Sequence, residues 1–209
     1  MTSFIIDDIE YKVEINRKRI KNINFRIEDK TIRVSCPFLC TDRYIIDLLK
    51  KNEKALIRMA KRSERQESRK EKILYLGNEL NFIQFKKIMF DGNTAYGPSV
   101  DKVNEYLEKN SLKVFEKRLE LYINEFGDIP AFRLRIRKMK TRWGVNNRSS
   151  KTITLNTMLI HYKPELIDYV IVHELSHFIH PNHSKNFWLL VSKYYPNYKD
   201  IRKYLKDPN

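Results

Sequence analysis

The sequence predicts an α+β protein, with a small N-terminal antiparallel sheet plus a helix, followed by a domain that contains a largely apolar helix. Two observations carry this prediction. Apolar and polar residues alternate through the first forty residues, and from residue 41 onward apolar residues recur at spacings of three and four. With 209 residues, 42% of them hydrophobic, the chain is long enough for one or two domains with a buried core.

Short alternating runs account for the predicted N-terminal sheet. Polar pairs such as Asp7-Asp8 and Asp29-Lys30 separate the runs, and this pattern predicts three or four antiparallel strands. The runs cover residues 4–6, 11–15, 23–27 and 31–34. Thr41 is a good N-cap for the helix that follows, which we expect to continue to about Arg69.

The middle of the chain returns to strands and then to a helix. We expect short strands over residues 74–89, followed by a tight turn at Asp91-Gly92-Asn93. Apolar residues at helical spacing predict one long helix over residues 101–126, which Gly127 and Pro130 end.

Strict alternation beyond this helix predicts two strands, over residues 132–137 and 152–159, joined by a loop over residues 141–151. The second of these strands offers an edge on which an extended peptide can pair. We divide the chain into three segments, which are residues 1–72, 73–127 and 128–209.

The formal charge of +15 is concentrated at the two ends of the chain. Residues 1–72 hold 19 Lys and Arg against 12 Asp and Glu, residues 73–127 hold 7 against 8, and residues 128–209 hold 15 against 6. An anionic partner, such as a nucleotide or a nucleic acid, therefore suits either end.

Three features of the sequence bear on the cellular compartment, namely the length of its apolar runs, its first residues and its cysteines. No apolar run approaches the roughly 20 residues that cross a membrane, and the start of the chain does not read as a secretory signal. The only two cysteines, Cys36 and Cys40, suit a reducing compartment. We therefore expect a cytoplasmic protein without a membrane partner.

All five histidines lie between His161 and His183. The helix expected over residues 164–180 places His173 and His177 four positions apart, so both side chains project from one face and can reach a single ion. Zinc accepts neutral imidazole nitrogens, and Glu174 lies beside them as the general base for a water molecule. This composition gives only about 0.008 chance matches to His-Glu-x-x-His, so the motif predicts a metal site.

Three other histidines are candidates for the third ligand. His180 lies seven positions from His173, about 10.5 Å along a continuous helix, which is too far for both to bind one ion. His183 follows Pro181-Asn182, which should end the helix and let the chain fold back. Its spacing from the second histidine also matches the third ligand of the metzincin pattern, so we predict His183. His161 is more typical of a residue at the end of a strand.

Taken together, these motifs resemble the YgjP-like metallopeptidases, relatives of the SprT-like and WLM groups. The resemblance is strongest over residues 130–195 and rests on Arg142-Trp143-Gly144, Ile153-Thr154-Leu155-Asn156, the run from Tyr169 to His177, Asn182-His183-Ser184 and Phe187-Trp188. It implies a zincin-like catalytic domain whose active-site helix bears HExxH, with Zn²⁺ bound by His173, His177 and His183 and with Glu174 as the catalytic acid and base.

Three residues near the motif are candidate contacts to the substrate or the transition state: Arg142, Asn156 and Tyr169. An arginine in the loop before the metal helix can steady an anionic substrate or a developing oxyanion, and a phenol can donate a proton. The family often continues Trp-Gly with Ser-Cys, whereas Val145-Asn146 follow here, so no role of that serine or cysteine carries over to this chain.

The leading functional hypothesis is a zinc-dependent metallopeptidase acting on a peptide or protein. The resemblance also brings an alternative, because a nucleotide pyrophosphatase activity has been attributed to some YgjP-like proteins. The local excess of Arg and Lys would then supply phosphate contacts, from Arg133, Arg135, Arg137, Lys138, Lys140 and Arg142. A third hypothesis makes residues 1–72 a nucleic-acid-binding module that directs the peptidase, as in SprT-like relatives.

Overall fold

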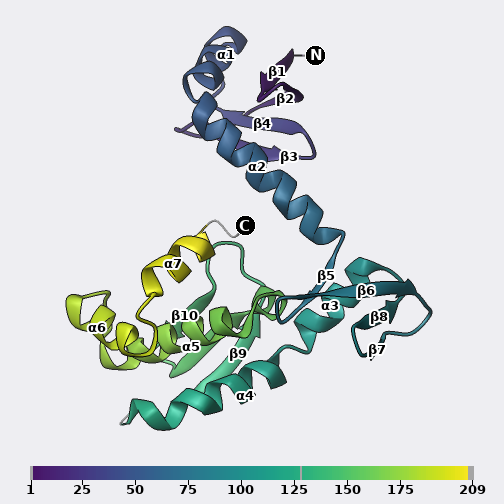
Figure 1. Cartoon of the computed structure of the whole chain (residues 1–209). Coiled ribbons are helices and arrows are strands. Elements are labelled where there is room, and N and C mark those ends of the chain that lie inside the picture. The colour runs from purple at the N-terminus through teal and green to yellow at the C-terminus, as the bar shows by residue number, and fades with distance from the viewer. Residues whose placement is uncertain (1, 128, 207–209) are drawn as a thin grey trace. The chain divides into compact units, whose positions relative to one another are not determined.

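The computed structural model describes residues 2–127 and 129–206 (Figure 1). The chain divides into two compact units, Met1–Arg69 and Lys70–Asn209, each with its own hydrophobic core. The α+β class predicted from the sequence is confirmed.

The first unit contains a four-stranded sheet and two helices. Its strands are β1 (Thr2–Ile6), β2 (Ile9–Arg17), β3 (Asn24–Glu28) and β4 (Thr31–Cys36), in the order β1-β2-β4-β3. The sheet is not wholly antiparallel, because β4 inserts between β2 and β3 and runs parallel to β2. The buried residues Ile32, Val34, Ile45, Leu49 and Leu56 join the sheet to the helices.

The single helix expected over residues 41–69 is two helices, α1 (Asp42–Lys51) and α2 (Glu53–Lys70). Thr41 caps α1 as predicted, since its hydroxyl accepts a hydrogen bond from the amide of Tyr44. The break falls at Asn52, whose side-chain amide donates to the carbonyl of Leu48 at 2.8 Å. A short polar side chain that bonds the local backbone competes with helix continuation, which explains the interruption.

The second unit begins with a four-stranded sheet followed by helices. Its strands lie in the order β5-β6-β8-β7. They are β5 (Ile73–Tyr75), β6 (Asn78–Gln84), β7 (Met89–Asp91) and β8 (Thr94–Gly97). The expected long helix is again divided, into α3 (Val100–Lys109), α4 (Leu112–Ile123) and the 3₁₀ turn η1 (Asn124–Phe126). Ser111 at the break is fully buried, and its hydroxyl donates to the carbonyl of Glu108.

The second sheet of this unit has three strands, β9 (Arg133–Arg137), β10 (Gly144–Asn147) and β11 (Thr152–Asn156), in the order β10-β11-β9. Strand β10 lies within residues 141–151, which we predicted to be a loop. Its Gly and Asn residues have low strand propensity, so pairing with β11 determines its conformation. The prediction that residues 152–159 offer a free edge is wrong, because β9 and β10 flank β11 and the 3₁₀ helix η2 (Thr157–His161) follows it.

Three helices complete the unit: α5 (Pro164–Ile179), α6 (Lys185–Tyr194) and α7 (Tyr198–Lys206). Helix α5 lies alongside the sheet (Figure 1), and most of its side chains are buried, from Ile167 to Phe178. One buried acid on this helix, Asp168, accepts hydrogen bonds from Arg118 and Tyr122 of α4. Because both carboxylate oxygens are bonded, this charge fixes α4 against α5 without an unpaired group.

Among the described residues, no helix is both long and apolar enough to cross a membrane.

Candidate metal centre

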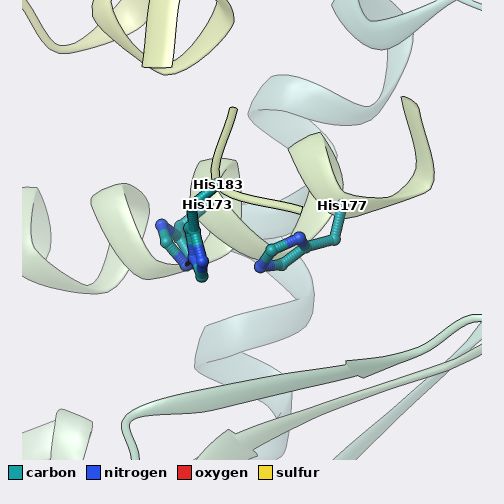
Figure 2. Close-up of side chains that lie close together, drawn as sticks. All are labelled: His173, His177 and His183. Atoms are coloured by element: carbon teal, nitrogen blue, oxygen red, sulfur yellow. Dashed lines mark hydrogen bonds between the residues drawn. The ribbon is translucent and has the colours of Figure 1, made fainter. Parts of the chain in front are cut away.

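The side chains of His173, His177 and His183 converge at the C-terminal end of α5 (Figure 2). One ring nitrogen from each lies within 4.8 Å of the others, and the Nε2 atoms of His173 and His183 are 3.1 Å apart. Two nitrogens bound to one tetrahedral zinc ion at about 2.0–2.1 Å would be separated by about 3.3 Å. The observed separation therefore suits two ligands of a single ion.

The end of α5 and the start of α6 determine where His183 lies. His180 ends α5 in an extended backbone conformation, and the hydroxyl of Ser184 caps α6 by accepting from the amide of Phe187. The short segment between these caps turns the chain back and carries His183. This return is the one that Pro181-Asn182 suggested in the sequence.

The three imidazoles are held in the neutral form that metal ions require. Burial, with the neighbouring rings, lowers the pKa of His173 to about 3, and burial likewise lowers the pKa of His177 and of His183. Nδ1 of His177 lies 3.3 Å from the carbonyl oxygen of His180. A carbonyl only accepts, so Nδ1 carries the proton and Nε2 of His177 keeps a free lone pair.

Glu174 lies beside the triad and is 5% exposed. Burial raises the pKa of its carboxyl to about 8, against the opposing effects of the Asn146 backbone and the Arg142 charge. No Lys, Arg or His among the described residues forms an ion pair with it. A buried carboxyl with a raised pKa next to a metal site has the properties of a general base or acid.

Strand β10 approaches this carboxyl very closely. A Cβ atom on Gly144 would lie 2.6 Å from Oε1 of Glu174, so any larger residue would displace the carboxylate. The side-chain amide of Asn146 donates to the backbone carbonyl of Glu174 at 2.7 Å. Gly144 and Asn146 were not assigned a role from the sequence, although a glycine inside a strand is a signal of close approach.

The three further candidates from the sequence occupy different environments. Arg142 is exposed and near enough to act on Glu174 electrostatically. Tyr169 is buried one turn before His173, with ring centroids 6.0 Å apart, and burial raises its pKa to about 12. Asn156 is also buried, but its amide is used within the protein: it bonds the backbone of Met139, Arg142 and Met158.

The two remaining histidines lie outside the triad. Nδ1 of His161 is 2.7 Å from the carbonyl of Leu74, and its Nε2 is 3.7 Å from Glu108. These contacts join η2 to β5 and α3, and neither partner of His161 belongs to the triad. His180 contributes its backbone carbonyl rather than its ring, as the acceptor for His177.

A stack of aromatic rings lies against one side of His183, which is otherwise exposed. The ring of Trp188 stacks on His183 with centroids 5.4 Å apart, and Tyr198 stacks on the other side of Trp188. The guanidinium of Arg202 lies 4.9 Å from the Trp188 ring. This cation on α7 also contributes to lowering the pKa of His173 and His183. Only the fold brings α7 to the site, so the sequence gives no local signal for Arg202.

Two of the arginines that the nucleotide hypothesis invoked, Arg133 and Arg135, lie on the sheet face opposite Glu174, whereas Arg142 is near enough to act on Glu174 electrostatically. Gly144 and Asn146 of β10 face Glu174, whereas Arg133 and Arg135 of β9 line a hollow with the alternate residues Val145 and Asn147. Arg133 and Arg135 are therefore poorly placed to contact a nucleotide at the metal centre. The comparisons below lend no support to a nucleic-acid partner either.

Comparison with known proteins identifies a family for this chain. The family model described as YgjP-like, metallopeptidase domain, matches residues 21–208. The chain is similar to two solved structures, the metallopeptidase zymogens of Pyrococcus abyssi abylysin and Methanocaldococcus jannaschii jannalysin. The identities are 30% and 22%, each match covers 44% of this chain and 93% or 92% of the other, and both TM-scores are 0.40. No curated protein gave a match.

Proposed function

The chain belongs to the YgjP-like metallopeptidase family and is a metal-dependent hydrolase, and from this premise we propose that it is a zinc peptidase whose ion is held by His173, His177 and His183. The observation that carries the proposal is that one ring nitrogen from each of the three histidines lies within 4.8 Å of the others. An all-nitrogen set of three ligands that leaves a coordination position open is typical of catalytic zinc.

Zinc would supply Lewis acidity, which lowers the pKa of an adjacent water molecule towards about 7 and polarises the scissile carbonyl. Glu174 accepts a proton from the attacking water and then returns it to the leaving amine nitrogen. Its burial supports this role, because a carboxyl with a pKa near 8 both takes and releases a proton around neutral pH.

The substrate backbone has a place to bind beside this carboxyl. Among the described residues, β10 pairs only with β11, so the other edge of β10 is open. An extended peptide can add to such an edge through main-chain hydrogen bonds. Since Gly144 of the same strand contacts Glu174, a peptide on this edge lies near the proposed base.

The proposal is tested with Glu174→Gln, compared with Glu116→Gln, an exposed position on α4. Bound zinc is measured by elemental analysis, and hydrolysis is measured on an unfolded protein and on a panel of nucleoside triphosphates. We expect zinc in all three proteins and peptide cleavage only in the native chain and in Glu116→Gln. Phosphate release without peptide cleavage would instead identify a nucleotide hydrolase, and full activity of Glu174→Gln would exclude this carboxyl as the base.

A further inference from the structure

The three-stranded sheet has a second polar surface, on the face opposite Glu174. A hollow of about 710 Å³ lies over β9, β10 and β11. Its polar lining residues come from all three strands and from the turn before β11, and are Arg133, Arg135, Asn147, Ser150, Lys151, Thr152 and Thr154. We call this surface the basic face.

Strand alternation explains why the basic face and the metal centre lie on opposite sides. Ile153 and Leu155 of β11 are buried in the core, whereas Thr152 and Thr154 line the hollow. The register pairs Thr152 with Arg133 and Thr154 with Arg135, so the arginines share this face with the threonines. The register of the strands therefore places these arginines and threonines side by side on the basic face.

The chemistry of the basic face selects an anion. Within the part of the chain that the structure describes, its lining contains two arginines and one lysine and no carboxylate. Among the described residues, none of these three cations forms an ion pair with a carboxylate within 4.0 Å. Side chains two apart on a strand repeat about every 6.6 Å, so a polymer with regularly spaced negative groups matches Arg133 and Arg135 better than a single small ion does.

Two features favour an acidic polypeptide over a nucleic acid. Surfaces that bind single-stranded nucleic acid combine cations with aromatic rings on which bases stack, but the only aromatic lining residue is Phe132, which packs against Phe178 at 5.2 Å. Strand β10 also belongs to both faces: Gly144 and Asn146 contact Glu174, while Val145 and Asn147 line the hollow. A polypeptide that passes the open edge of β10 can therefore reach both surfaces.

We propose that the basic face is an exosite for an acidic segment of the protein substrate, held by Arg133, Arg135 and Lys151. Its link to cleavage rests on the proposed peptidase function, whereas binding to the face does not. The exosite selects protein substrates that carry a run of Asp or Glu near the cleaved bond.

The first test measures binding of a fluorescent poly-glutamate peptide to the full chain by anisotropy. We expect the double variant Arg133→Gln/Arg135→Gln to weaken binding by about tenfold or more, because it removes two charge-assisted contacts. Lys86→Gln/Lys87→Gln, which removes the same charge from an exposed loop of the other sheet, should leave binding nearly unchanged. An equal loss of peptide affinity in both double variants would overturn the exosite, because the net charge of the protein alone would then explain the loss.

Competition and catalysis separate the remaining outcomes. An oligonucleotide that displaces the peptide at lower concentration, and that also requires Arg133 and Arg135, would make the face a nucleic-acid surface and overturn the proposal.

Glu174→Gln should bind the peptide as the native chain does. Among cleaved substrates, Arg133→Gln/Arg135→Gln should slow those with an acidic segment and spare neutral ones; equal slowing of both would contradict the exosite. If the native chain binds the peptide but cleaves nothing, the peptidase proposal alone fails.

Discussion

Helix α5 carries two buried carboxyl groups in contrasting environments. Asp168 is 3% exposed and Glu174 is 5% exposed, and they lie six residues apart, about 9 Å along the helix axis. Arg118 binds both oxygens of Asp168, one of them at 2.7 Å, and Tyr122 donates to the same group at 3.0 Å. Glu174 has no such cation among the described residues, and burial raises its pKa to about 8.

The difference separates a group that holds the fold from one available for chemistry. Leaving a buried carboxyl without a partner costs free energy, so such groups persist mainly where they react or bind. The N-terminal half of α5 is therefore expected to govern stability and the C-terminal half to govern activity. Variants of these two carboxyl groups, and of residues that pack near the site, test this division and are taken from the largest expected effect to the smallest.

Glu174→Gln should give the largest effect, on activity alone. We expect kcat/KM for peptide cleavage to fall by as much as about 10⁴-fold, because the amide cannot accept a proton. The free energy of unfolding should not fall, since no ion pair is lost. Kinetics and denaturant unfolding measured on the same preparation check both statements. A large loss of stability would place Glu174 in the same class as Asp168.

Asp168→Asn should show the converse behaviour. Removing one member of a buried ion pair leaves Arg118 without its anion, and we expect the free energy of unfolding to fall by about 3–5 kcal/mol. Below the unfolding transition, zinc content and kcat should remain close to native values. Glu120→Gln, an exposed change on the helix that bears Arg118, is the control and should be nearly neutral in chemical denaturation.

Asn156→Ala tests a residue that the sequence placed among the substrate contacts. Its amide bonds the backbone of the segment from Met139 to Arg142 and the first residues of η2. Removing a buried amide that serves several backbone groups should cost about 2–3 kcal/mol of stability. Activity lost at unchanged melting temperature would show that Asn156 contacts substrate after all.

Gly144→Ala should affect activity less than Glu174→Gln does, and it acts on Glu174 indirectly. The added Cβ displaces the carboxylate of Glu174. Because a displacement of about 1 Å can slow catalysis by about 10²-fold, we expect kcat to fall by up to that factor while zinc remains bound. Gly92→Ala provides the contrast, because that site has open space but a φ of +52°. It should lose some stability and keep its activity. Native kcat in Gly144→Ala would mean that the close approach has no role.

The sequence predicted the parts of this architecture that depend on local patterns. The spacing of His173 and His177 placed both on one helix face, and Pro181-Asn182 suggested the return of the chain that brings His183 beside them. The cap residue Thr41 begins a helix that periodicity indicated.

Features that depend on distant contacts were not predictable in the same way. Arg118 and Asp168 are fifty positions apart, and nothing in the local sequence pairs them. Strand β10 contains Gly144 and two asparagines, which resemble a loop until β11 pairs with them. The breaks at Asn52 and Ser111 interrupt continuous periodicity, because side-chain bonds to the backbone there compete with helix propagation.

X-ray absorption at the zinc edge tests the central claim most directly, with the native chain compared with His183→Ala after loading with one equivalent of zinc. The proposed site predicts three imidazole nitrogens and one oxygen ligand at about 2.0–2.1 Å in the native chain, and the loss of one imidazole in the variant. Identical spectra for the two proteins, or only two imidazoles in the native chain, would contradict a zinc centre built from His173, His177 and His183.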